Sequence, residues 1–375
     1  MQNDHNTTES TARPVHGGIK EAELRALGLR LEDCLDFSAS VSPLGPPDGV
    51  AEAIAGVDLS SYPDPHCLAL TEAIATHHGR DGVDAGNVIV GNGSTEIIHL
   101  LTRAYIEQMP ADGSRSALLL TPTYGEYDGA VRISGGKVHA LPATRGCREF
   151  TWDTDSAVRL ISSHGPALTF VCNPNNPTGA LITLPDIESL ADAMHVAGGL
   201  LVLDEAYINL SDRWAEAGAI ALAARHSSIV VLRSMTKDYA LTALRLGYGI
   251  AAPAVIARLQ ALQPDWSVNG LAQAAGMVAI ADQEYLARAR RAVAVSRECV
   301  VERLGALGIQ CYPTAANFIL ARVGDAPELR DRLALQGLFV RDCTSFGLPD
   351  CIRIGLRPVD DCVRLTDAIA ELIDR

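Results

Sequence analysis

The chain has 375 residues, of which 48% are hydrophobic and 20% are charged, and its formal net charge is -14. This length and composition predict a globular protein with one large core and a second lobe. The excess of acidic residues argues against a nucleic-acid-binding or anionic-membrane surface, because contacts with phosphates require clustered Lys and Arg.

Residues 1–14 are polar and lack the apolar segment of a signal peptide, so they are expected to form a disordered tail. No apolar run approaches the ~20 residues that cross a bilayer. The nine cysteines are scattered and include no C-x-x-C pair, which favours reduced thiols in a cytoplasmic protein. The ten histidines include no H-E-x-x-H, and no metal site is predicted.

From about Asp48 to about Pro253, short apolar runs alternate with helix-like stretches such as Ser94–Ile106 and Pro185–Ala197. Several runs are continuous in Val, Ile and Leu, as in strands buried on both faces of a mainly parallel sheet. The pattern predicts a doubly wound α/β domain, whose ligands lie at the carboxyl ends of the strands. The expected strands are Val88–Gly91, Ala117–Pro122, Lys137–Leu141, Leu168–Asn173, Leu200–Asp204, Ile229–Arg233 and Gly247–Ala251.

After about Ala261 the pattern changes to that of a smaller α+β lobe. One long helix is expected over Gln273–Leu304, and a final helix over Val359–Ile373. Short strand-like runs lie between them at Phe318–Ala321, Leu338–Val340 and Cys351–Ile354. We therefore expect a large domain over residues 48–261 and a small domain over 262–375, with residues 15–47 packing against the small domain.

Four polar residues follow apolar runs in a pattern that suits one cofactor. Lys237 ends the segment Ser-Met-Thr-Lys, Asp204 and Tyr207 lie in LLVLDEAY, and Asn176 lies in NPNNPTG. A lysine amine, a carboxylate that pairs with a pyridine nitrogen and two donors to a phenolic oxygen suit pyridoxal 5'-phosphate (PLP), held as a Schiff base on Lys237. We therefore interpret Lys237, Asp204 and Tyr207 as catalytic residues.

Taken singly, each motif has a plainer explanation. A lysine after Ser or Thr is usually a solvated surface residue, and Asp204 suits a helix N-cap after a strand. The run NPNNPTG also suits a rigid turn, since Asn, Pro and Gly each favour one. Their joint occurrence after successive strands favours the PLP site.

A phosphate cup is predicted beside these residues. Gly93, Ser94 and Thr95 open a helix whose free N–H groups and dipole suit a phosphate. Ser234, Thr236 and Arg245 would complete the cup, Arg245 by a paired contact. Tyr124, in TPTYGEY, would stack on the cofactor ring or, equally, serve as a core aromatic.

This combination resembles the fold-type-I PLP enzymes, the aspartate-aminotransferase-like superfamily, from His16 to the C-terminus. Within that superfamily the chain is similar to histidinol-phosphate aminotransferases and, more closely, to the L-threonine-O-3-phosphate decarboxylases of cobalamin synthesis. The motifs that carry the closer likeness are HGG at His16–Gly18, DFSASVSPLGPP at Asp36–Pro47, SYPD around Tyr62, WSVN at Trp266–Asn269 and VRDCTSFGLP before Cys351-Ile352-Arg353.

The resemblance implies a seven-stranded, mainly parallel sheet in the large domain and a homodimer with shared active sites. It places Tyr62 on the cofactor phosphate of the other subunit, Arg353 on the substrate carboxylate and Arg341 on a second anionic group. It also places His16, Gly17, Ser40 and Asn176 beside the substrate. The family has Asn at three positions where this chain has Ile19, Ser40 and Ser42, which weakens the assignment of the substrate.

The resulting prediction is an enzyme acting at Cα of an amino acid with a second anionic group, a phosphate or a phosphonate. Decarboxylation is favoured over transamination by the HGG, DFSA and WSVN likeness. A PLP-binding sensor on the same fold is disfavoured, because the chain has no basic helix-turn-helix stretch. A non-PLP α/β protein is disfavoured by the number of motifs that agree.

Overall fold

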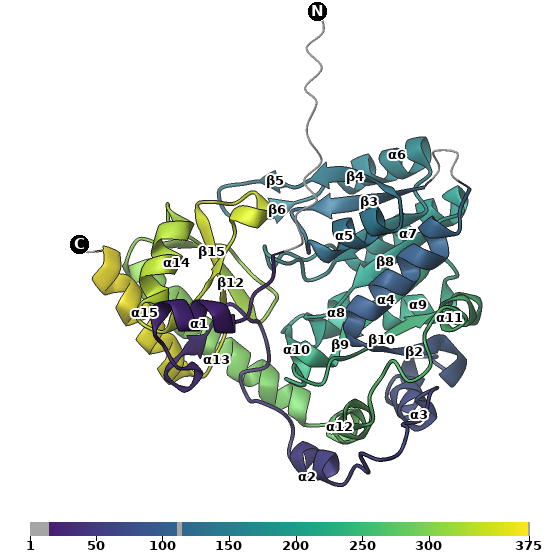
Figure 1. Cartoon of the computed structure of the whole chain (residues 1–375). Coiled ribbons are helices and arrows are strands. Elements are labelled where there is room, and N and C mark those ends of the chain that lie inside the picture. Colours follow the sequence, from purple (N-terminus) through teal and green to yellow (C-terminus); the bar gives the residue numbers. More distant parts are fainter. Residues whose placement is uncertain (1–14, 111–114, 374–375) are drawn as a thin grey trace, which may run out of the picture.

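A seven-stranded sheet runs through the larger lobe of the computed structural model, which describes residues 15–110 and 115–373 (Figure 1). The strand order is β2-β10-β9-β8-β7-β3-β4. β10 is antiparallel to both neighbours and the other pairs are parallel. The strands are β2 (Val88–Asn92), β3 (Ser116–Thr121), β4 (Lys137–Pro142), β7 (Leu168–Cys172), β8 (Leu200–Asp204), β9 (Ile229–Ser234) and β10 (Leu246–Ala251). All seven predicted strands and the fold class are confirmed.

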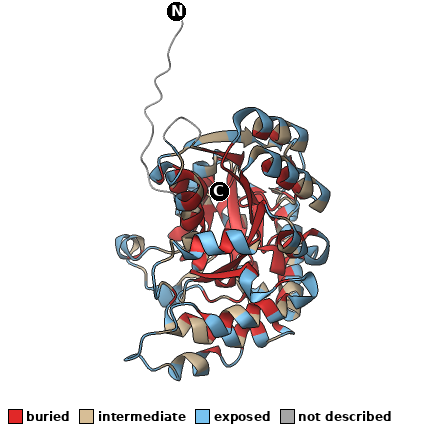
Figure 2. Cartoon of the chain, turned by 90° about the vertical axis from the view of Figure 1, so that its right-hand side faces the viewer, coloured by how far each residue is buried: buried red, intermediate tan, exposed pale blue. Residues whose placement is uncertain are grey.

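Both faces of this sheet are buried, which explains the continuous apolar runs. On β3, Leu118 and Leu120 belong to one core cluster while Ala117 and Leu119 belong to another on the opposite face. Figure 2 shows the buried strands enclosed by helices that are exposed on their outer sides. The helices against the first face are α3 (Leu68–His77), α6 (Thr154–His164), α7 (Leu184–Ala197) and α9 (Ile220–Arg225). Those against the second are α4 (Gly93–Thr102), α5 (Glu126–Ile133) and α11 (Pro253–Gln260).

The smaller lobe is built on a four-stranded sheet in the order β11-β12-β15-β14. Ile319 and Ile352 point into the core that the lobe's helices share. The opposite face of the sheet meets the large lobe, where the ring of Phe318 packs edge-on against Tyr207, with ring centroids 5.1 Å apart. The elements are β11 (Gln310–Cys311), β12 (Phe318–Arg322), β14 (Arg341–Asp342), β15 (Cys351–Gly355), α13 (Tyr285–Ala306), α14 (Ala326–Ala334) and α15 (Val359–Ile373).

The long helix expected over Gln273–Leu304 is wrong. The chain forms α12 (Gly270–Ala281) and then α13, which begins at Tyr285. Asp282 separates them, because its Oδ1 accepts hydrogen bonds from the backbone N–H groups of Glu284 (3.1 Å) and Tyr285 (2.9 Å). Such an Asp satisfies free N–H groups and starts a new helix. The uninterrupted Ala/Arg pattern concealed this break.

The N-terminal segment pairs with the smaller lobe. The short strand β1 (Leu35–Asp36) lies parallel to β13 (Leu338–Phe339), which therefore stands apart from the four-stranded sheet. The helix α1 (Glu21–Leu27) packs Leu24 against Ala334 and Phe339. Figure 1 shows α1 beside the helices of that lobe. The tail predicted over residues 1–14 lies outside the described part of the chain.

Three short helices and one hairpin complete the described elements used below. The helices are α2 (Val50–Ala55), α8 (Trp214–Ala217) and α10 (Met235–Asp238). The hairpin of β5 (Thr144–Arg145) and β6 (Phe150–Thr151) follows β4 and reaches the small lobe, as Figure 1 shows. Across residues 15–110 and 115–373, no helix is long and apolar enough to cross a membrane, and no group of three or more metal-ligating side chains is placed to hold an ion.

A buried ion pair holds the segment after β8 to β9. The Glu205 Oε2 atom lies 2.6 Å from Arg233 Nη2 and 2.8 Å from Arg233 Nε, and the Glu205 side chain has no exposed surface. We expect Glu205→Gln to lower the free energy of unfolding by about 3–5 kcal/mol, because it leaves the buried charge of Arg233 without its carboxylate partner. Denaturant unfolding of the cofactor-free protein measures this loss.

The matched control for that experiment is Glu188→Gln. Glu188 pairs with Arg225 at 3.0 Å, but both side chains are exposed. Exposed pairs contribute about 0–1 kcal/mol, so this variant should unfold almost like the wild type. Equal losses from the two substitutions would contradict a structural role for the buried pair.

Candidate active site

Three of the predicted residues meet at one edge of the large sheet. Asp204 ends β8, Asn176 follows the end of β7, and Lys237 follows β9. These strands are parallel neighbours, so their carboxyl ends lie side by side, at the position where open α/β sheets bind ligands. The sheet topology therefore assembles residues that are about 60 positions apart in sequence.

The amine of Lys237 loses its proton more readily than an ordinary lysine. Burial, together with the positive charges of Arg353 and Arg245, lowers the pKa of Lys237 to about 8. Asp204 acts in the opposite direction but does not outweigh them. A neutral amine is the nucleophilic form, so the site activates Lys237 for attack on a carbonyl.

Asp204 is a buried carboxylate without a cationic partner. Its Oδ2 accepts a hydrogen bond from the Tyr127 hydroxyl at 2.7 Å, and its Oδ1 accepts one from the Ala206 N–H at 3.0 Å. Burial raises the pKa of Asp204, and within the described residues no Lys, Arg or His pairs with it. A carboxylate in this condition is stabilised by a cationic group that binds in front of it.

The N-terminus of α4 lies beside Arg245, where the phosphate cup is predicted. Gly93 has a φ of +72°, and a Cβ added there would lie 3.0 Å from Nη2 of Arg245. A Cβ added at Gly247 would lie 2.5 Å from the backbone N of Ser94. Glycine at both positions keeps the free N–H groups of α4 and the Arg245 guanidinium open to an anion.

The remaining predicted cup residues lie at the end of β9 and in α10. Ser234 is the last residue of β9, and Thr236 lies in the short helix α10, next to Lys237. The Thr236 hydroxyl donates to the Leu246 carbonyl at 3.4 Å, which is a long contact and leaves its oxygen as an acceptor. Their contacts with a phosphate stay a prediction.

Tyr124 is half-buried, and its stacking on the cofactor stays a prediction. Burial raises the pKa of Tyr124 to about 12, and a hydrogen bond with Thr95 opposes that change. The Tyr124 ring lies 5.7 Å from the ring of His16 and 5.5 Å from that of Tyr127, in an edge-on arrangement. It therefore lies between the phosphate helix and the N-terminal segment, where a ring of the cofactor would stack.

Arg353 comes from β15 of the small lobe and crosses to the large lobe. Its Nη1 donates to Oδ1 of Asn176 at 2.5 Å, and its Nη2 donates to the Ser38 carbonyl at 2.7 Å. With its amide oxygen thus occupied, Asn176 presents its amide nitrogen as a donor. A Cβ at Gly17 would lie 2.2 Å from the Ser38 carbonyl oxygen, so Gly17 permits this close packing.

Other predicted residues lie further out. Arg341 donates through Nη2 to the Val15 carbonyl at 2.9 Å and to the Ser345 hydroxyl at 2.6 Å. Tyr62 is 81% exposed and packs on Trp266, with ring centroids 4.8 Å apart. Among the described residues, no contact connects Tyr62 with the site of its own chain. Its contact with the cofactor phosphate of a second subunit stays a prediction.

Two of the three departures from the decarboxylase pattern, Ile19 and Ser42, have structural explanations. Ile19 packs in the apolar cluster of Leu24 and Phe339. The Ser42 hydroxyl accepts from the Tyr285 hydroxyl at 2.7 Å, and the Ser42 N–H donates to the Lys237 carbonyl at 2.8 Å. Ser40 is buried, and its hydroxyl has no partner among the described residues. Ile19 and Ser42 therefore support the walls of the site through packing and hydrogen bonds.

Sequence reasoning missed Tyr127 and Ser38. Tyr127 holds Asp204, and the Ser38 carbonyl holds Arg353. Tyr127 lies in the first turn of α5, three residues after Tyr124, which precedes the helix, so helical spacing did not connect the two rings. Ser38 acts through its backbone, which leaves no signal in the side chain.

Together, the activated amine, the unpaired buried carboxylate and the glycine-lined helix terminus with its arginine fit PLP, which carries an aldehyde, a ring nitrogen and a phosphate. Such a site on a doubly wound sheet is characteristic of fold-type-I PLP enzymes. Residues 32–369 match the model of the family "Aminotransferase class I and II". The chain belongs to the aminotransferase class I and II family, and it is a PLP-dependent enzyme.

Two curated relatives illustrate the range of activities in this family. A candidate threonine-phosphate decarboxylase from Caldanaerobacter subterraneus subsp. tengcongensis is 32% identical over 342 residues, which cover 90% of this chain and 89% of the relative. The histidinol-phosphate aminotransferase of Moorella thermoacetica is 31% identical over 345 residues, which cover 91% and 85%. Relatives of both activities therefore match nearly the whole chain at similar identity.

Solved structures agree on the fold. The histidinol-phosphate aminotransferase of Sinorhizobium meliloti, in complex with pyridoxal-5'-phosphate, superimposes with a TM-score of 0.83 at 24% identity and covers 98% of this chain and 96% of its own. The L-threonine-O-3-phosphate decarboxylase of Porphyromonas gingivalis gives a TM-score of 0.75 at 23% identity, with coverages of 90% and 99%.

Proposed function

We propose that this enzyme acts at Cα of an amino acid that carries a phosphate or phosphonate, and that it releases the carboxylate as carbon dioxide. The observation that carries the proposal is the pair of buried arginines, Arg353 and Arg341, neither of which has a carboxylate partner among the described residues. Burial lowers the pKa of Arg341, and the charge of Arg353 lowers it further. Arg341 and Arg353 lie opposite each other on the paired strands β14 and β15, and two such guanidiniums without a carboxylate suit a ligand with two anionic groups.

A cavity of about 340 Å³ supports this assignment. His16, Gly17, Lys20 and Arg341 are among the residues that line it. Arg330 also lines it but is paired with Glu23, so Arg341 is the buried cation that remains for a ligand. We assign the substrate carboxylate to Arg353 and the phosphate or phosphonate to Arg341. His16 would contact the same group if its ring turned away from Glu126, to which its Nε2 is bonded at 2.6 Å.

When bound, PLP supplies an electron sink for the charge that develops at Cα. Asp204 would hold the ring nitrogen in its protonated form, since its carboxylate lacks another cation. Tyr207 and the amide nitrogen of Asn176 would donate to the phenolic oxygen. Lys237, in its protonated form, would donate to Cα the proton that replaces the carboxylate.

The second candidate function is transamination of the histidinol-phosphate aminotransferase type. The comparable identity to relatives with that activity favours it. The two reactions break different bonds at Cα, and an assay separates them. Incubation with carboxyl-labelled O-phospho-L-threonine should release labelled carbon dioxide without 2-oxoglutarate. Amino transfer that requires 2-oxoglutarate, with no carbon dioxide, would contradict decarboxylation.

Arg353→Met is expected to raise KM for an amino-acid substrate by roughly 10²-fold, because it removes a charge-assisted paired contact with the carboxylate. Steady-state kinetics on the PLP-loaded variant measures the change. Arg353→Lys is the control, since it keeps the charge without the paired geometry. Its KM should lie between those of the wild type and Arg353→Met. An unchanged KM in Arg353→Met would remove Arg353 from the substrate site.

We further propose that the enzyme is a cytoplasmic homodimer with shared active sites. With O-phosphothreonine as the substrate, its reaction would belong to cobalamin synthesis. Leu59, Tyr62 and Leu68 are exposed apolar side chains, and half-exposed Trp266 lies against Tyr62. Burying this patch against a second copy would bring Tyr62 to the other subunit's phosphate cup. The division into residues 15–47, 48–261 and 262–375 is part of this proposal. Sedimentation of the Tyr62→Ala variant tests the interface.

A further inference from the structure

The residues on either side of the hairpin β5–β6 are hydrogen-bonded to the end of β3. The Thr121 carbonyl accepts hydrogen bonds from the Ala143 N–H at 2.7 Å and from the Trp152 indole N–H at 3.0 Å. Thr121 is the last residue of β3 and precedes Tyr124 by three positions. The residues that flank the hairpin are therefore fixed to the start of the loop that carries Tyr124.

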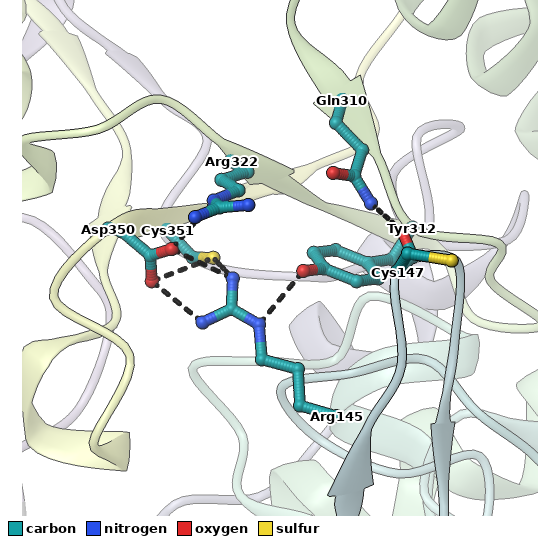
Figure 3. A network of polar contacts seen from close by, with 7 residues as sticks. All are labelled: Arg145, Cys147, Gln310, Tyr312, Arg322, Asp350 and Cys351. Carbon is teal, nitrogen blue, oxygen red and sulfur yellow. Dashed lines mark hydrogen bonds and ion pairs between the residues drawn. The ribbon is translucent and has the colours of Figure 1, made fainter.

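The other end of the hairpin is bound to the small lobe through Arg145 (Figure 3). The Arg145 guanidinium donates from Nη1 and Nη2 to the two carboxylate oxygens of Asp350, each at 2.9 Å. Its Nε donates to the Tyr312 hydroxyl at 2.9 Å, and its Nη2 lies 3.3 Å from Sγ of Cys351. Paired contacts of this kind fix both distance and orientation.

Apolar packing surrounds this arginine and keeps it ordered. Phe150 of the hairpin packs against Tyr312, with ring centroids 5.0 Å apart, and both belong to one buried cluster with Leu320 and Cys351. The hydrogen bond to Arg145 lowers the pKa of Asp350, so this carboxylate stays charged. Burial raises the pKa of Cys351 to about 12, so its sulfur meets Arg145 as a neutral thiol. A second contact joins the lobes, because Gln310 donates to the Cys147 carbonyl.

Asp350 and Cys351 lead directly into Arg353. Asp350 precedes β15, Cys351 is its first residue, and Arg353 lies two residues further along. Side chains two apart on a strand point to the same face, so Cys351 and Arg353 both face the large lobe. The hairpin therefore connects the Tyr124 loop at one end with the start of the Arg353 strand at the other.

We propose that Arg145 is a positioning residue, which holds the start of β15 against the large lobe so that Arg353 keeps its place beside Asn176. The proposal rests on the assignment of Arg353 to the substrate carboxylate. Arg145 touches neither Arg353 nor Lys237 in any described contact, so it acts through Asp350 and the strand. Small errors in placing a binding group are costly, which is why such a support matters.

The chain offers a matched control for this arginine. Arg322 also bonds Asp350, through Nε to Oδ2 at 2.9 Å, but it is 57% exposed and lies within the small lobe on β12. Arg145→Met and Arg322→Met each remove one cation from the same carboxylate. Of the two substitutions, only Arg145→Met removes a contact between the lobes.

The experiment uses the PLP-loaded full-length protein and two measurements. Hydrogen exchange of the backbone amides at 350–353 should quicken in Arg145→Met and stay at the wild-type rate in Arg322→Met. The affinity for O-phospho-L-threonine, followed by the change in the visible spectrum, should fall on the order of tenfold in Arg145→Met and not in Arg322→Met. PLP content should equal that of the wild type in both variants. If Arg145→Met does not fold, Arg145→Lys replaces it, with the same required differences from Arg322→Met.

Equal exchange rates in Arg145→Met and Arg322→Met would overturn the proposal. Faster exchange with unchanged affinity would overturn it as well, because Arg353 would then be positioned by other contacts. A wild-type protein whose spectrum does not respond to O-phospho-L-threonine would contradict the proposed function. In that case the exchange comparison, which needs no substrate, still decides whether Arg145 holds β15.

Discussion

Lys237→Ala is expected to lower turnover on the order of 10³-fold or more, because it removes both the amine that binds PLP covalently and the group that moves the proton at Cα. The variant should also lack the visible absorbance of the covalently bound cofactor. It should still retain some PLP, since the phosphate cup of Gly93, Ser94 and Arg245 is untouched. Steady-state rates and absorbance spectra of the reconstituted protein measure these changes.

Lys137→Ala is the matched control for this variant. Lys137 is an exposed lysine at the start of β4, far in sequence from the site residues. Its removal should leave the rate and the spectrum unchanged. Wild-type turnover in Lys237→Ala would contradict the assigned role of the amine.

Asp204→Asn is the second large effect that we expect. Asparagine keeps the size of the side chain but removes the charge that would hold the ring nitrogen protonated. Charge that is buried and preorganised near a reacting centre contributes on the order of 10²–10³-fold to kcat. We expect a loss of at least this size, with KM and PLP content changed much less. Steady-state kinetics with a direct measurement of bound PLP tests the prediction.

Tyr127→Phe separates the charge of Asp204 from its placement. It removes the 2.7 Å hydrogen bond to Oδ2 and leaves the carboxylate in place. The loss of one such hydrogen bond to a charged group is worth about 1.5–3 kcal/mol, so kcat should fall less than in Asp204→Asn. A near-normal kcat in Asp204→Asn would refute the role of the charge, whatever the effect of Tyr127→Phe.

The large sheet was predictable because its strands are buried on both faces. Val231 and Leu232 point to opposite sides, yet both are fully buried, so the run stays apolar without alternation. The polar residues that follow such runs, Asp204 and Lys237, then stand out by contrast. Because the strands are parallel, predicting them as a set also predicts that these residues meet.

Features that depend on contacts distant in sequence were not predictable. The break between α12 and α13 depends on one Asp282 carboxylate within a strongly helical sequence. Thr144 and Arg145 form a two-residue strand, too short for any periodic signal. The partners of Arg145 are over 160 positions away, at Tyr312 and Asp350. Nothing near Arg145 in the sequence indicates them.

The covalent attachment of PLP to Lys237 is the claim on which the account depends. The chain has three lysines, Lys20, Lys137 and Lys237, so the modified residue can be identified without ambiguity. Borohydride reduction of the PLP-saturated protein, followed by peptide mapping with mass spectrometry, should place one pyridoxyl group on Lys237. A protein that stays unlabelled, or that carries the label on Lys20 or Lys137, would contradict the account.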